Sequence, residues 1–123
     1  MFRRITGLSL FSLCLALVAS ATQAVAQQAP VVHLGSDTRA KSPEQCLNDA
    51  RFGITETGLQ VSFTAGPHIV GAGALRGAGV AVVVTCLAQG GRTFISVSGV
   101  SQDSSAAEEG RNRVRTITMG PPS

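Results

Sequence analysis

The fold is decided by the stretch VAVVVTCL, residues 80–87, which is followed after Gln89-Gly90-Gly91 by RTFISV, residues 92–97. Both runs are rich in β-branched side chains, and the glycines between them supply the positive φ angles that a tight reversal needs. The two runs are therefore predicted to form a β-hairpin at the centre of the sheet. Because the first run is apolar at both alternating sets of positions, it is predicted to be a strand covered on both faces.

The amino-terminal part of the chain has the pattern of an export signal. A short basic segment, residues 1–4, precedes an apolar run, residues 8–18, that is too short to span a bilayer comfortably. The small residues Ala24-Val25-Ala26 then form a site that signal peptidase accepts. Residues 1–26 are predicted to be a cleaved secretory signal peptide, with an uncleaved anchor as the alternative. A lipidated form is not predicted, because Cys14 lies inside the apolar run.

Cleavage changes the electrostatic character of the chain. The 123 residues carry ten basic and seven acidic side chains, but Arg3 and Arg4 leave with the signal, which lowers the net charge from +3 to +1. This balance gives no reason to predict nucleic-acid binding, and the absence of Trp and Tyr removes aromatic platforms on which bases stack. The predicted partner is an envelope protein or a small ligand, with no nucleic acid and no membrane span after cleavage.

Two cysteines, Cys46 and Cys86, remain after cleavage, in a chain directed to an oxidising compartment. We predict that they form a disulfide, which would close a loop of about 40 residues and restrict the unfolded chain by roughly 4 kcal/mol. A reactive or metal-binding thiol pair is the alternative. It lacks the C-x-x-C spacing and the neighbouring ligands of such sites, so no metal and no cofactor are predicted.

A first helix is predicted to begin at Ser42, which can cap it and which precedes a proline suited to the first helical position. Gly53 and Gly58 mark two alternative ends for this helix. The segment before it, residues 27–41, is predicted to be a flexible lead-in that contains a short edge strand at residues 31–34. The chain from Gly35 to Lys41 is expected to be a loop.

A strand is predicted at residues 59–64, where Leu59, Val61 and Phe63 alternate with polar residues and would share one dry face. A second helix is predicted after Asp103 or Ser105, with acidic residues in its first turn and arginines in its later ones, an order that suits the helix dipole. Residues 119–123 are expected to be a tail.

The Gly-rich segment 71–79 is the place where the composition suggests a ligand site. Backbone N–H groups of such a segment can approach an anion, and an arginine can contact phosphate or carboxylate. The spacing is G-x-G-x-x-x-G, however, and a strand follows where a phosphate-binding loop would lead into a helix. We favour a Gly/Ala-rich strand and turn. The alternative is a small-ligand or anion site formed by His68, Gly71, Gly73, Arg76 and Gly77.

The predicted fold is a single α+β domain, residues 42–118, with an antiparallel sheet of three or four strands and both helices packed on it. A split β-α-β arrangement that resembles the ferredoxin-like fold is the alternative. The helix start with Cys46-Leu47 and the later Val-rich strand that ends in Cys86-Leu87 resemble small secreted bacterial proteins of unknown function. Because such families carry no assigned activity, the resemblance implies none here.

Three classes of function are compatible with these patterns. We prefer a small exported, periplasmic or secreted, non-catalytic binding or interaction module of the bacterial envelope. The alternatives are the ligand-binding protein described above and an enzyme without a recognisable motif. Spacings such as G-x-S-x-G and H-E-x-x-H do not occur, so no catalytic residues are predicted. His33, which has apolar neighbours, is expected to be a partly buried strand residue, and the oligomeric state is left open.

Overall fold

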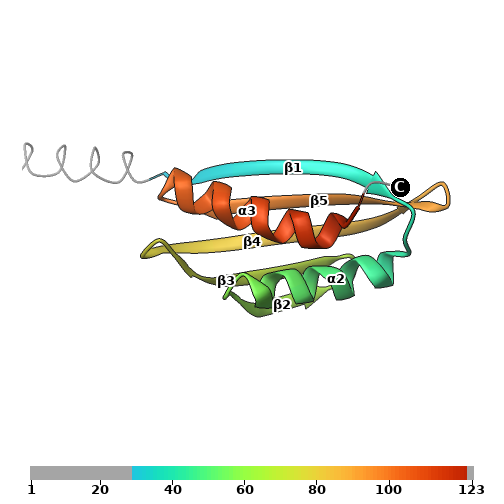
Figure 1. The fold of residues 1–123 in the computed structure, drawn as a ribbon, viewed down its shortest axis with the longest axis horizontal. Coiled ribbons are helices and arrows are strands. Elements are labelled where there is room, and N and C mark those ends of the chain that lie inside the picture. The colour runs from blue at the N-terminus through green and yellow to red at the C-terminus, as the bar shows by residue number, and fades with distance from the viewer. Residues whose placement is uncertain (1–28, 122–123) are drawn as a thin grey trace, which may run out of the picture.

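Five strands and two helices make up residues 29–121, the part of the chain that the computed structural model describes (Figure 1). In chain order they are β1 (Val31–Arg39), α2 (Pro43–Glu56), β2 (Gln60–Ala65), β3 (His68–Leu75), β4 (Ala78–Gln89), β5 (Arg92–Ser101) and α3 (Ser104–Met119). The strands lie in the order β1-β5-β4-β3-β2, and all neighbouring pairs are antiparallel. The predicted signal peptide, residues 1–26, lies outside the described residues.

The α+β class is confirmed, but the sheet has five strands rather than three or four. Strand β1 is also longer than the predicted edge strand at residues 31–34, since it pairs with β5 from Val31 to Arg39. The expectation of a loop after residue 34 is therefore wrong for residues 35–39. An edge strand is held by backbone pairing on one side and does not need an apolar pattern, so the polar composition of this segment was misleading. The split β-α-β alternative is also wrong, because β1 and β2 lie at opposite edges of the sheet.

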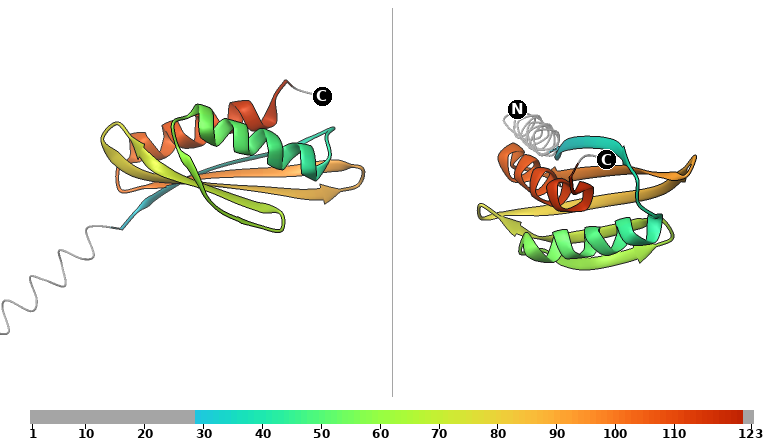
Figure 2. Two further views of the ribbon diagram at one scale, coloured as in Figure 1. Left: turned by 90° about the horizontal axis from the view of Figure 1, so that it is seen from below. Right: turned by 45° about the vertical axis from the view of Figure 1, so that its right-hand side comes forward.

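Both helices pack on the same face of the sheet, as the edge-on view in Figure 2 shows. Helix α3 contacts chiefly β1, β5 and β4, whereas α2 contacts β4, β3 and β2 and also packs against α3. Within residues 29–121 no helix covers the opposite face. The helices therefore do not supply the second cover that was predicted for the central strand, because they lie side by side on one face of the sheet.

The predicted helix start is confirmed, since the side chain of Ser42 accepts a hydrogen bond of 3.1 Å from the backbone N–H of Gln45. The later of the two predicted ends is correct: α2 continues through Gly53 to Glu56, and Gly58 follows with φ of +84°. Gly53 lies inside the helix, where a Cβ would press on α3. For α3, the cap is Asp103, which accepts a hydrogen bond of 2.9 Å from the N–H of Ala106.

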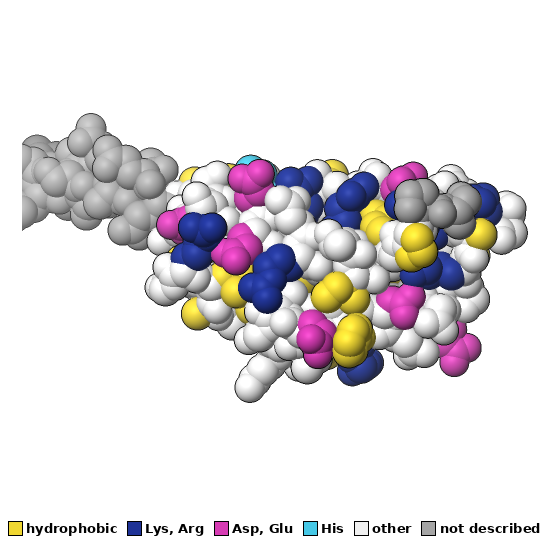
Figure 3. Space-filling model, in the orientation of Figure 1, with side chains coloured by type: hydrophobic (Ala, Val, Ile, Leu, Met, Phe, Trp, Pro, Cys, Tyr) yellow, Lys and Arg dark blue, Asp and Glu magenta, His cyan; other side chains and the backbone are white. Residues whose placement is uncertain are grey.

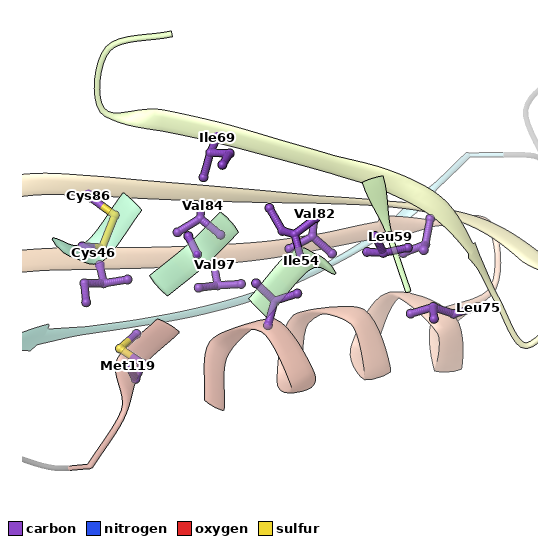
Figure 4. Close-up of a cluster of buried hydrophobic side chains, with 14 of the residues drawn as sticks. Cys46, Ile54, Leu59, Ile69, Leu75, Val82, Val84, Cys86, Val97 and Met119 are labelled. Atoms are coloured by element: carbon purple, nitrogen blue, oxygen red, sulfur yellow. A yellow bond between two sulfur atoms is a disulfide. The ribbon is translucent and has the colours of Figure 1, made fainter. Parts of the chain in front are cut away.

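The hydrophobic core lies between the sheet and the two helices (Figure 4). The Cys46–Cys86 disulfide is part of this layer and joins the first turn of α2 to β4, with the two Cα atoms 6.0 Å apart. Both cysteines are buried. Met119, expected in a tail, is instead the last residue of α3 and is also buried in the core. Because Met119 is buried, the core reaches the carboxyl-terminal end of α3.

Two glycines let the helices approach the sheet closely. A Cβ at Gly99 of β5 would overlap the backbone carbonyl oxygen of Ala107 in α3. A Cβ at Gly71 of β3 would overlap the side chain of Ile54 in α2. Each helix is therefore seated at a point where the strand beneath it has no side chain.

Candidate functional site

The uncovered face of the sheet is the surface with the most distinctive composition. Successive side chains of a strand point to opposite faces, and in β4 the buried set that includes Val82 and Val84 points toward the helices. Val83 and Thr85 consequently point away from them. The registers of the four strand pairs extend this assignment across the sheet. We call the surface formed by these outward side chains the open face.

Cross-strand partners arrange the open face in rows that run from β1 to β2. The central row, which is apolar except for Ser98, consists of Leu34, Ser98, Val83, Val70 and Phe63. On one side of it lies a second row of Val32, Val100, Ala81, Ala72 and Gln60. On the other side lies a row that is mostly hydroxylic, with Ser36, Ser96, Thr85, His68 and Ala65. A short row of Thr38, Phe94 and Leu87 follows.

Phe63 reaches the open face because β2 contains an irregularity. The register shifts between Val61, which pairs with Gly71, and Phe63, which pairs with Val70. Such a bulge inserts one extra residue and turns the following side chains to the other face. The prediction that Phe63 shares a dry face with Val61 is therefore wrong, and an aromatic ring is added to the open face.

Large apolar side chains are exposed on the open face. Among the described residues, five large hydrophobic side chains are exposed, and four of them belong to this face: Val32 (59%), Leu34 (62%), Phe63 (57%) and Leu87 (44%). The fifth, Phe52 (58%), lies on α2. Antiparallel sheets that face water on one side usually present polar side chains there. A cluster of this kind is typical of a binding surface.

Charge is almost absent from the open face. Arg92, which pairs with Gln89 at one end of β5, is the one arginine among the outward side chains of the described strands, and none of these side chains is acidic or a lysine. Figure 3 shows the helix-covered side, where basic and acidic side chains are spread over the surface. The two sides of the molecule therefore differ in both charge and hydrophobicity.

The helix side of β1 carries one of the ion pairs. The carboxylate Oδ2 of Asp37 lies 2.6 Å from Nη1 of Arg39, and Oδ1 accepts a hydrogen bond of 2.8 Å from the backbone N–H of Thr38. The hydrogen bond from Arg39, followed by that from Thr38, lowers the pKa of Asp37 below its ordinary value of 3.8. A carboxyl group of this kind stabilises the fold above its unfolded pKa, and the contribution is lost as the pH falls through the lowered folded pKa.

We expect Asp37→Asn to lower the free energy of unfolding at pH 7, with little difference from the unsubstituted protein once the pH is well below 3.8. The reason is that the carboxyl group of the unsubstituted protein is then protonated and has lost the same ionic interaction. Urea unfolding of both proteins at neutral and acidic pH measures this difference. A difference of equal size at both pH values would contradict the assignment.

The structure separates the residues of the predicted anion site. His68 lies on the open face, where its Nδ1 is 2.9 Å from Oγ1 of Thr85. A Cβ added at Gly71 or Gly73 would point to the other face, where it would meet Ile54 or Leu59, respectively. The segment 71–79 is the end of β3, a two-residue turn and the start of β4, which confirms the strand and turn that we favoured over a ligand-binding loop.

Arg76 and Gly77 form that turn, at the opposite end of β3 from His68. Both have positive φ, and Nε of Arg76 donates a hydrogen bond of 2.8 Å to Oε2 of Glu109 on α3. Arg76 therefore lines an open depression of about 370 Å³ beside acidic residues of α3. His68 and Arg76 do not share a pocket, and binding of an anion by this segment stays a prediction.

The remaining histidine, His33, points to the helix side of β1, where its Nε2 lies 3.0 Å from Oγ of Ser104. Within residues 29–121 there is no group of three His, Cys, Asp or Glu side chains that could hold a metal ion. Nor is either helix in this part of the chain long and apolar enough to cross a membrane.

Comparisons with known proteins give no relative from which a function could be transferred: no family model, no curated protein and no solved structure matches this chain. The function must therefore be argued from the surface itself.

Proposed function

We propose that this chain is a small exported, non-catalytic interaction module of the bacterial envelope, and that it binds its partner through the open face. The observation that carries the proposal is the concentration of exposed apolar side chains on one face, to which the described strands contribute a single arginine and no acidic residue. Exposure of such a surface to water is unfavourable by about 25 cal/mol for each Å² of apolar area. Binding of an apolar partner surface would remove this cost.

Export to the periplasm or the medium belongs to the same proposal. It is supported by the signal-like pattern of residues 1–26 and by the buried disulfide, since disulfides persist in oxidising compartments. The disulfide also anchors α2 to β4 and so helps to hold the sheet that presents the open face.

A binding role explains the open face better than a catalytic one does. The histidine on this face, His68, contacts a threonine hydroxyl across the strands, in the mostly hydroxylic row. A nucleophile and base that act together are usually oriented by a third group, such as a carboxylate. The outward side chains of the described strands include no carboxylate.

A photoreactive amino acid placed at one of two matched positions tests the proposal in the native compartment. Leu34 on the open face and Phe52 on α2 are exposed to nearly the same extent, 62% and 58%. We expect covalent adducts from position 34 and few or none from position 52. Absence of adducts from position 34, or equal yields from both, would contradict binding through the open face.

A further inference from the structure

We infer that the occupant of the open face is a second copy of this chain, and that two sheets pack face to face in a two-fold symmetric dimer. The inference rests on the proposed function, because it names the partner of the same surface. Three properties of the open face support it: its area, its near absence of charge and the order of its rows.

The area of the open face is close to what a stable dimer requires. Five strands about 4.8 Å apart, with outward residues over about seven positions at 3.4 Å each, give a projected area of roughly 600 Å². The accessible area is larger than the projected area, because side chains protrude from the sheet. A specific interface of standard size buries about 800 Å² on each partner. The open face therefore fits an interface of ordinary size without a contribution from the helices.

The lack of charge favours a partner surface of the same kind. A charged partner surface would lose its hydration on this face without gaining a countercharge in return. Another copy of the chain offers a surface that has the same extent, the same apolar rows and no carboxylate. Two-fold symmetry makes such a self-complementary patch the usual interface of a homodimer.

The order of the strands gives the arrangement of the two copies. Because β4 is the middle strand, a two-fold axis parallel to the strands places β4 over its own counterpart, β5 over β3 and β1 over β2. Each row then lies over the same row of the partner, apolar on apolar and hydroxylic on hydroxylic. Leu34 faces the partner subunit's Phe63 in the central row.

This arrangement also keeps the arginine out of the interface. Arg92 lies on β5 beyond the row of Thr38, Phe94 and Leu87. The strand opposite β5 would be β3, which begins at His68 and has no residue at the level of Arg92. Nη2 of Arg92 lies 3.5 Å from the backbone oxygen of Thr38 near the end of β1, so the guanidinium group stays at the rim, where a charge costs little.

Sedimentation equilibrium over a series of concentrations tests the inference, with oxidised protein purified from its native compartment. We expect the unsubstituted protein to be a dimer. Leu34→Glu should raise the dissociation constant at least about tenfold, because it places a carboxylate opposite an apolar side chain. Phe52→Glu, an equally exposed apolar position on α2, is the control and should leave the dimer unchanged. Circular dichroism and the unfolding midpoint of each variant show whether the fold is retained.

A double variant tests the row-on-row arrangement through a gain in the affinity of dimerisation instead of a loss. Leu34→Glu combined with Phe63→Lys places opposite charges on side chains that face each other across the dimer. We expect it to dimerise more tightly than either single variant. A double variant that is weaker than both would overturn the arrangement.

The outcomes separate this inference from the proposed function. A monomer at all concentrations, together with adducts between position 34 and a different protein, would overturn the second copy as partner and retain the open face as a binding surface. A monomer without any adducts would overturn both. A dimer that Leu34→Glu does not weaken would place the contact elsewhere and would also overturn the inference.

Discussion

Replacement of Cys46 and Cys86 by alanine is expected to lower the free energy of unfolding by about 4 kcal/mol. The disulfide closes a loop with a sequence separation of 40 residues, which restricts the unfolded chain, and its sulfurs are buried in the core between α2 and β4. The loss is a large fraction of the total stability of a domain of this size, which is typically 5–15 kcal/mol. Urea unfolding of the double variant and of the oxidised protein measures it.

Reduction of the unsubstituted protein provides the control for side-chain volume. Reduced protein keeps both sulfur atoms and loses only the covalent bond, so it should lose most of the same stability. If the reduced protein and the double variant were each within about 1 kcal/mol of the oxidised protein, the disulfide would not have the stabilising role that we assign to it.

Gly99→Ala is expected to destabilise the fold by about 3 kcal/mol, because overpacking at a close contact forces the backbone to move. The added Cβ would overlap the carbonyl oxygen of Ala107, which belongs to the backbone of α3 and cannot rotate away as a side chain could. The whole helix would have to shift on the sheet. Thermal or urea unfolding of the variant measures the effect.

Gly79→Ala is the matched control on the neighbouring strand. A Cβ at Gly79 of β4 has no heavy atom within 4 Å, other than those of its chain neighbours, and the backbone there does not need a positive φ. Its free energy of unfolding should stay the same or rise slightly, because alanine restricts the unfolded chain more than glycine does. Equal effects of the two substitutions would contradict the close approach of α3 to β5.

Much of the fold could be predicted from local patterns. The hairpin of β4 and β5 is confirmed, with positive φ at Gly90 and Gly91 between the strands, and so are the cap at Ser42 and the pairing of Cys46 with Cys86. The hairpin and the cap depend on residues near one another in sequence. The disulfide could be predicted because only two cysteines remain after the predicted signal peptide, which leaves one possible pairing. Strand β1 was predicted too short because its pairing depends on β5, about 60 residues away, and not on its own pattern.

The open face could not be predicted because it depends on where the helices pack. The apolar run at residues 80–87 indicated that both faces of β4 are dry, but not that both helices lie on one of them. The outward turn of Phe63 depends on a bulge that its alternating neighbours do not reveal. Similarly, the roles of Gly71 and Gly73 became clear only from the packing, in which Gly71 lies against Ile54 of α2 and Gly73 lies against Leu59, which follows that helix.

The central claim is that the open face is covered in the working protein, and thiol labelling in the native compartment tests it most directly. Leu34→Cys and Phe52→Cys place a thiol at two positions of nearly equal exposure, one on the open face and one on α2. We predict that a maleimide reacts at position 34 at least about tenfold more slowly than at position 52, because the bound partner excludes the reagent. Equal rates at the two positions would show that the open face is bare and would contradict the claim.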